Sequence, residues 1–294
     1  MGLQSDVYVG ELEHNGAQLQ SPHRVTLDER NDFPSAWLPG DRGILFYSDR
    51  NGNWDIFQQR IDQTVAQEFV LGPDEQREPR LAPDGAAVLY WKYTTGSQPP
   101  AASGIHLLRV PIAGGAPQPV LDASAGAQFR CPSQPGRDCI LSEEKNGRRQ
   151  LIFTAFETVR GRKGEVAKME HETTASPQWD LSPDGTKLAL VGLEDQKNHI
   201  RIVDLGSSST RELIVPLISA QLLDIAWTRD GTGFFVSTSS ARESLLLHIT
   251  LKGQVHELWK GHSPLSTPVP SPDGKHLAFA ISSQNSNAWM LEFF

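Results

Sequence analysis

The chain has 294 residues, a formal net charge of −8 at pH 7 and a hydrophobic content of 38%, as expected of a soluble globular protein. The negative charge argues against nucleic acid or an anionic membrane as a partner, because phosphate groups would be repelled. No run of about 18 apolar residues is present to insert into a membrane, and the N-terminus lacks the basic and apolar regions of a signal peptide.

A short turn rich in Pro, Asp and Gly recurs six times, each time between two short apolar segments. In chain order the turns lie at 38–41, 82–85, 134–138, 182–185, 228–231 and 271–274. Measured from positions 39, 83, 135, 183, 229 and 272, successive turns are 44, 52, 48, 46 and 43 residues apart. A period in this range is typical of a β-propeller with four strands in each blade.

The segments around each turn fit this architecture. Those that follow a turn, such as 43–48, 87–91, 187–191, 233–237 and 276–280, are apolar at nearly every position, which suits a strand packed between two neighbouring blades. The later, more polar segments 67–71 and 255–259 suit an outer edge. The sequence therefore predicts an all-β, six-bladed propeller of four-stranded antiparallel blades in a single domain. The expected blades span about 30–73, 76–123, 126–171, 174–216, 220–261, and 264–294 together with 5–28.

Two further strands, 6–12 and 23–27, precede the first repeat. The C-terminal blade lacks a fourth strand if 288–293 is its third, so we expect one N-terminal strand to complete that blade and close the ring. The strand at 6–12 is then surplus, which suggests that the ring was preceded by further repeats in a longer chain. A longer, membrane-anchored chain is therefore one expectation.

Two cysteines, Cys131 and Cys139, flank the third turn. In a hairpin they can face each other and form a disulfide, which would indicate an oxidising compartment. Two free thiols and half of a metal site are the alternatives. Metal is disfavoured because no other cysteine and no histidine cluster is near.

The turns at 82–85, 182–185 and 271–274 resemble the signature of the WD40-like Pro-Asp repeat family, and so does the segment 47–57. The resemblance covers about residues 5–294 and is of the TolB-like kind, found in the C-terminal propellers of bacterial multidomain sensor kinases and regulators. It implies a sensing or docking module, often periplasmic or otherwise outside the cytoplasm; a cytoplasmic location is the alternative. The signature marks turns, so it implies no particular ligand.

The sequence contains no constellation of catalytic residues. There is no Gly-x-Ser-x-Gly motif, P-loop or His-Glu-x-x-His motif, so we expect no catalytic residues, metal or cofactor. Loops at the central channel are the expected binding surface, on the face opposite the Pro-Asp-Gly turns. The candidate ligand-binding residues are Arg30, Asp32, Asp49, Arg50, Arg77, Glu78, Lys92, Tyr93, Gln178, Trp179 and Asp224.

These residues carry mixed charges, which favours a peptide, protein or cell-wall-type ligand. The first hypothesis is therefore a non-catalytic binding, sensing or scaffold module. The alternative is a carbohydrate-active propeller, a lyase or hydrolase whose acidic residues come from separate blades. A third hypothesis is a scaffold that binds partners at its outer edges.

Overall fold

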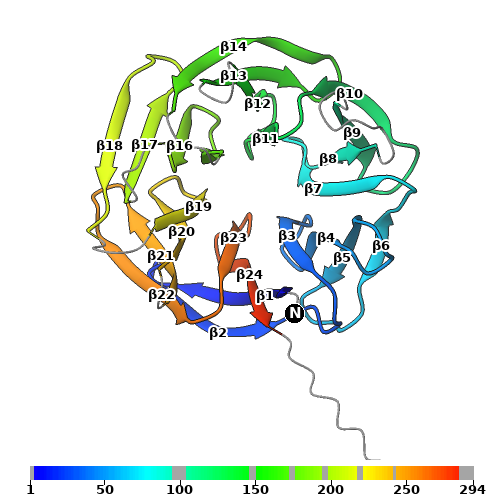
Figure 1. Ribbon diagram of the computed structural model, residues 1–294, viewed down its shortest axis with the longest axis horizontal. Helices are drawn as coiled ribbons and strands as arrows, with labels where there is room; N and C mark the ends of the chain where they lie inside the picture. The colour runs from blue at the N-terminus through cyan, green and yellow to red at the C-terminus, as the bar shows by residue number, and fades with distance from the viewer. Residues whose placement is uncertain are drawn as a thin grey trace, which may run out of the picture.

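The computed structural model describes residues 3–94, 104–145, 150–171, 176–193, 198–216, 221–240 and 243–284. Twenty-four strands form six four-stranded antiparallel sheets, which are arranged as blades around a central channel (Figure 1). The predicted six-bladed propeller is therefore confirmed. None of the described segments forms a helix that is long and apolar enough to cross a membrane.

Five blades are continuous in sequence. Blade 1 contains β3 (Asp32–Trp37), β4 (Gly43–Ser48), β5 (Asp55–Arg60) and β6 (Gln67–Val70). Blade 2 contains β7 (Glu75–Leu81), β8 (Ala87–Tyr93), β9 (Ile105–Pro111) and β10 (Gln118–Ala123). Blade 3 contains β11 (Gln128–Arg130), β12 (Cys139–Lys145), β13 (Gln150–Glu157) and β14 (Gly161–Glu170). Blade 4 contains β15 (Gln178–Leu181), β16 (Lys187–Val191), β17 (His199–Asp204) and β18 (Thr210–Ile214). Blade 5 contains β19 (Gln221–Trp227), β20 (Gly233–Ser239), β21 (Ser244–Thr250) and β22 (Val255–Gly261).

Blade 6 joins the two ends of the chain. Its inner strands are β23 (Leu265–Pro270) and β24 (His276–Gln284), and its outer strands are β1 (Leu3–Glu13) and β2 (Gln18–Arg24). β1 pairs with β24 over nine residue pairs, and β2 pairs with the other side of β1. The ring is thus closed by two N-terminal strands.

The prediction that 6–12 is a surplus strand is therefore wrong. β1 occupies the third position of blade 6 because Val7 and Val9 are buried there, in the same apolar cluster as Trp37 of blade 1. Residues 288–293, which we expected in that position, lie outside the described residues.

The apolar core is divided into six clusters, one at each interface between neighbouring blades. The packing of β8 explains why this strand is apolar at successive positions. Leu89 and Trp91 pack toward blade 3, whereas Val88 and Tyr90 pack toward blade 1. A strand between two blades buries both faces, so it needs no polar alternation.

The Pro-Asp-Gly turns hold the inner hairpin of each blade in register. In blade 4, Ser182 Oγ donates to Asp184 Oδ1 at 2.6 Å, and the same oxygen accepts the Thr186 N–H at 3.0 Å. Gly185 has a φ of +73°, which costs glycine little. Burial alone would raise the pKa of Asp184, but these hydrogen bonds lower it below its ordinary value, so the turn favours the charged carboxylate.

The hairpin of blade 3 is held by a disulfide instead. Cys131 and Cys139 are bonded, with a Cα–Cα distance of 4.2 Å, so of the three alternatives the disulfide is confirmed. Cys139 is fully buried in the cluster between blades 2 and 3.

Candidate functional site

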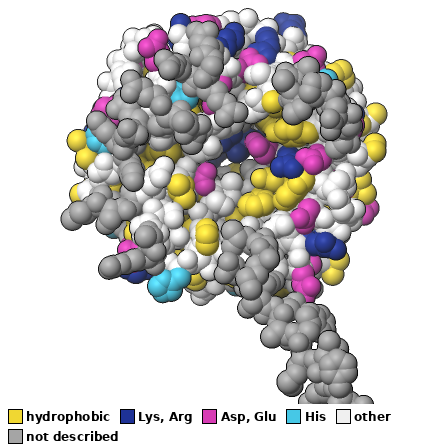
Figure 2. Space-filling view, in the orientation of Figure 1, with side chains coloured by type: hydrophobic (Ala, Val, Ile, Leu, Met, Phe, Trp, Pro, Cys, Tyr) yellow, Lys and Arg dark blue, Asp and Glu magenta, His cyan; other side chains and the backbone are white. Residues whose placement is uncertain are grey.

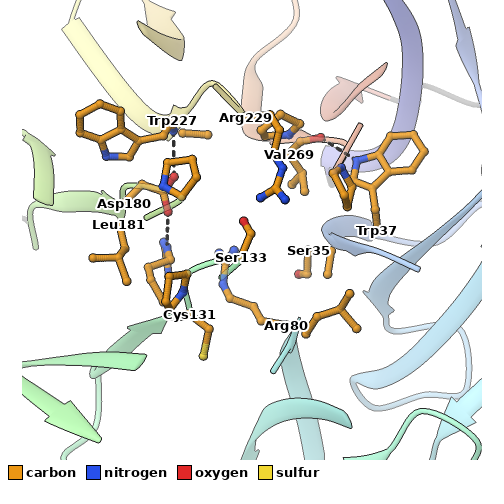
Figure 3. A pocket seen from close by; sticks show the side chains of 18 of the residues that line it. Ser35, Trp37, Arg80, Cys131, Ser133, Asp180, Leu181, Trp227, Arg229 and Val269 are labelled. Atoms are coloured by element: carbon orange, nitrogen blue, oxygen red, sulfur yellow. Dashed lines mark hydrogen bonds and ion pairs between the residues drawn. The ribbon is translucent and has the colours of Figure 1, made fainter. Parts of the chain in front are cut away.

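The channel widens into a cavity of about 360 Å³ that is lined by residues of all six blades. The cavity lies at the end of the inner strands where they enter the Pro-Asp-Gly turns, which we call the turn face. Figure 3 views it from the side opposite to that of Figure 1, so the blade order runs in the reverse sense. The volume of the cavity is within the range of pockets that bind small ligands.

The innermost wall of the cavity is formed by one equivalent position in each blade. Each of these residues lies on the first strand of its blade. In blade order, they pair with the second-strand residues Leu45, Leu89, Ile140, Ala189, Phe235 and Ala278. We call the six the channel ring: Ala36, Arg80, Arg130, Asp180, Ala226 and Val269. Blades 2, 3 and 4 supply its charged residues, and blades 5, 6 and 1 supply its small apolar residues, so this ring is charged on one side only.

A second ring surrounds the opening of the cavity. In five blades it is formed by the second residue of the turn, and in blade 3 by Pro132, which precedes the turn; we call it the mouth ring: Pro39, Pro83, Pro132, Pro183, Arg229 and Pro272. Blade 5 is the exception, because it has arginine where the other five have proline. In Figure 3 the Arg229 side chain points into the central space.

Asp180 connects three blades at the charged side of the channel. Its Oδ2 accepts the Trp227 backbone N–H at 2.8 Å, and its Oδ1 lies 3.5 Å from Arg130 Nε. Arg130 also lies over the Trp179 ring, 5.4 Å from its centre. Burial raises the pKa of Asp180 above its ordinary value, although the Arg130 and Arg80 guanidinium groups act in the opposite direction.

Asp224 makes a similar connection between blades 5 and 6. Its Oδ2 accepts the Thr267 backbone N–H at 3.1 Å and the Ser237 hydroxyl at 3.2 Å. Burial raises the pKa of Asp224, and these hydrogen bonds oppose the shift. Thr267 has a φ of +51° where β23 is bulged, and such bulges often re-aim backbone groups near binding sites.

Arg80 lies beside this arrangement and is half-buried. Burial first, and then the neighbouring Arg130 charge, lower the pKa of Arg80 to about 10. Its Nε is buried without a hydrogen-bond partner. Among the described residues, neither Arg80 nor Arg229 has an ion pair within 4.0 Å.

The residues predicted as ligand contacts fall into three places. Gln178, Trp179 and Asp224 line the cavity. Trp179 is fully buried, and its indole N–H donates to Ser142 Oγ at 2.8 Å, so it packs between blades 3 and 4 as well as bordering the channel.

A second group lies on blade 2, near the opposite end of the channel. Arg77 stacks over the rings of Trp54 and Tyr93, at 4.7 and 5.6 Å, and pairs with Glu75 at 2.7 Å. Glu78 follows Arg77 at a bulge, with a φ of +53°. Lys92 pairs with Asp74 at 2.9 Å.

The third group belongs to blade 1, where the predicted residues bind mainly one another. Arg50 pairs with the fully buried Asp32 at 2.9 Å and with Asp28 at 2.8 Å. Asp49 accepts both the backbone and side-chain N–H groups of Asn31, at 2.9 and 2.8 Å. This network fixes the loop into β3. Arg30 lies beside it and is exposed.

Around the hollow at the centre of the ring, basic and acidic side chains lie side by side with hydrophobic ones (Figure 2). Sequence reasoning missed the charged residues of the channel ring and the arginine of the mouth ring. Part of the signal was present in the repeats, since Arg80 and Asp180 stand at the same distance before their turns and Arg229 replaces a recurring proline. The ligand contacts at the opposite rim stay a prediction.

Solved structures with a similar fold were found by comparison. One is a protein assigned as TolB from Agrobacterium tumefaciens, with a TM-score of 0.73 and 14% identity, covering 97% of this chain and 100% of that one. TolB from Acinetobacter baumannii has a TM-score of 0.61 and 15% identity, covering 95% of this chain and 64% of that one. An oligogalacturonate lyase in complex with manganese has a TM-score of 0.58 and 13% identity, covering 93% of this chain and 77% of that one. At these identities the likeness concerns the propeller fold. No protein-family model and no curated protein matches the chain.

Proposed function

We propose that the protein is a non-catalytic binding module that takes a peptide segment of a protein partner into its central channel. The observation that carries the proposal is the cavity of about 360 Å³, to which every blade contributes. The likeness to two TolB propellers supports it at the level of the fold.

The two-sided wall of the cavity favours a peptide. The charged residues of the channel ring offer polar contacts, while Ala36, Ala226 and Val269 leave an apolar surface opposite them. Pockets that bind a ligand selectively usually combine apolar walls with a few placed polar groups. A peptide presents both kinds of surface on each short stretch of chain.

We also propose that the protein works outside the cytoplasm. The support is the bond between Cys131 and Cys139, because disulfides persist mainly in oxidising compartments. The test is to isolate the protein from its native host with free thiols blocked and to find the two cysteines bonded by mass spectrometry.

The binding function is tested by selecting peptides from a random display library on the purified protein. Ser133 is exposed and its side chain points into the cavity (Figure 3), so Ser133→Trp should narrow the channel without disturbing the core. Val159, which is 70% exposed in the outer turn of the same blade, offers the matched control Val159→Trp. The proposal requires selected peptides to lose affinity for the first variant and to keep it for the second. Equal binding by both variants would reject the channel as the site.

The carbohydrate-active alternative stays a prediction, prompted by the oligogalacturonate lyase of similar fold. Among the described residues there is no group of three or more His, Cys, Asp or Glu that could hold a metal ion. Incubating the protein with oligogalacturonate, with and without manganese, tests it directly. Cleavage products that disappear in an Asp180→Asn or Asp224→Asn variant would favour this alternative over binding alone.

A further inference from the structure

The lining of the cavity contains more positive than negative groups. Three arginines, Arg80, Arg130 and Arg229, line it together with two carboxylates, Asp180 and Asp224. The whole chain, by contrast, has a net charge of −8. The cavity is therefore a basic pocket in an acidic protein.

Both carboxylates are already engaged in holding blades together. Asp180 binds Arg130 and the Trp227 N–H, one with each oxygen. Asp224 accepts hydrogen bonds from Thr267 and Ser237. Neither forms an ion pair with the remaining two arginines among the described residues.

Arg80 and Arg229 thus line the same cavity, and neither forms an ion pair within 4.0 Å with a described residue. Arg80 belongs to the channel ring, where its Nε is buried and unpartnered. Arg229 belongs to the mouth ring, where the other repeats have proline. A ligand that enters from the turn face passes Arg229 and then reaches Arg80.

We infer that the bound peptide presents a carboxylate to Arg80 and Arg229. This inference rests on the proposed function and specifies its ligand as an acidic peptide. The carboxylate belongs either to an Asp or Glu side chain or to the C-terminus of the peptide.

The physical reason is the unfavourable free energy of the arginine side chains when no ligand is bound. A guanidinium in a partly dehydrated site that lacks a partner is unfavourable, and a carboxylate relieves this cost while forming charge-assisted hydrogen bonds. Hydrogen bonds to charged groups contribute about 1.5–3 kcal/mol, or roughly a tenfold or greater gain in affinity.

The experiment uses the peptides selected on the wild-type protein. Each is synthesised in three forms: unchanged, with Asp and Glu replaced by Asn and Gln, and with an amidated C-terminus. Dissociation constants are measured by fluorescence anisotropy for the wild type, Arg80→Gln and Arg229→Pro. The second variant restores the residue of the other repeats, and Arg160→Gln serves as control because Arg160 is 84% exposed at the outer turn of blade 3.

We expect one of the two neutralised forms to bind the wild type and Arg160→Gln at least about tenfold more weakly than the unchanged peptide does. The form that does so identifies the source of the carboxylate. For Arg80→Gln, the dissociation constants of the neutralised and unchanged peptides should differ by less than about threefold. For Arg229→Pro, the difference should be intermediate between those of the wild type and Arg80→Gln.

Two results would overturn the inference in different ways. Peptides that depend on an open channel but bind equally well in all three forms would reject the carboxylate and leave the proposed function standing. Failure to select any channel-dependent peptide would reject the proposed function, and this inference with it.

Discussion

Asp180 of blade 4 accepts a hydrogen bond from the backbone N–H of Trp227 in blade 5, at 2.8 Å. The other oxygen of the same carboxylate lies 3.5 Å from Arg130 Nε in blade 3. One side chain therefore ties three successive blades together at the wall of the cavity. It shapes the site and also contributes to the stability of the ring.

Replacing Asp180 by alanine should lower the free energy of unfolding by about 2–3 kcal/mol, because it leaves the Trp227 N–H and the Arg130 charge without their partner. Asp180→Asn should cost less, since an amide oxygen can still accept the N–H. Urea denaturation measures both. Asp62→Ala is the control, because Asp62 is 61% exposed and should change stability by less than about 0.5 kcal/mol. Equal losses in the alanine and asparagine variants would contradict the role of the N–H bond.

Replacing Arg80 by glutamine should raise the free energy of unfolding, by about 1 kcal/mol. The reason is that Arg80 is a partly buried charge beside Arg130, with no ion pair among the described residues. Binding sites commonly keep such unfavourable groups at the expense of stability. Thermal and urea unfolding in the absence of peptide measure the effect. A loss of more than about 1 kcal/mol would show that Arg80 stabilises the fold.

Asp32 should make stability depend on pH. Burial raises its pKa from 3.8 to about 6 in the folded protein, so between these values the folded state binds more protons than the unfolded state. Its contribution to stability is therefore full below pH 3.8, declines as the pH rises to about 6, and stays constant above. The decrease in unfolding free energy between about pH 4.5 and about pH 7.5 should be about 2 kcal/mol larger in the wild type than in Asp32→Asn. An identical pH dependence in both proteins would refute this.

Reducing the disulfide between Cys131 and Cys139 should lower the free energy of unfolding by about 2–3 kcal/mol, because the cross-link closes a short loop in the unfolded chain. Urea denaturation of oxidised and reduced protein measures the difference. A Cys131→Ala, Cys139→Ala double variant should be insensitive to reductant. If it responds to reductant as the wild type does, the effect does not come from this bond.

The spacing of the turns was sufficient to predict the blades, because each blade repeats the same hairpin chemistry. The order of strands in blade 6 was not predictable in the same way. The segments 6–12 and 288–293 both look like a third strand in the sequence, and the sequence alone does not reveal that Val7 and Val9 of the first segment are buried against blade 1.

The channel was harder to predict than the blades. Arg80 and Asp180 stand two residues before the turns of their repeats, and Arg130 stands four residues before its turn, but a single charged residue in a strand has no visible partner in sequence. Their meeting depends on the ring, which brings together positions about 50 residues apart. Arg229 could have been found, since it replaces a recurring proline.

The most direct test of the account is photo-crosslinking of a selected peptide from inside the channel. A diazirine analogue of leucine, which is much smaller than tryptophan and leaves the channel open, is incorporated at Ser133, which lines the cavity, or at Val159, which lies in the outer turn of the same blade. Mass spectrometry then measures the adducts after illumination. The account predicts peptide adducts from position 133 and none from position 159, whereas adducts from 159 alone, or equally from both, would contradict binding in the channel.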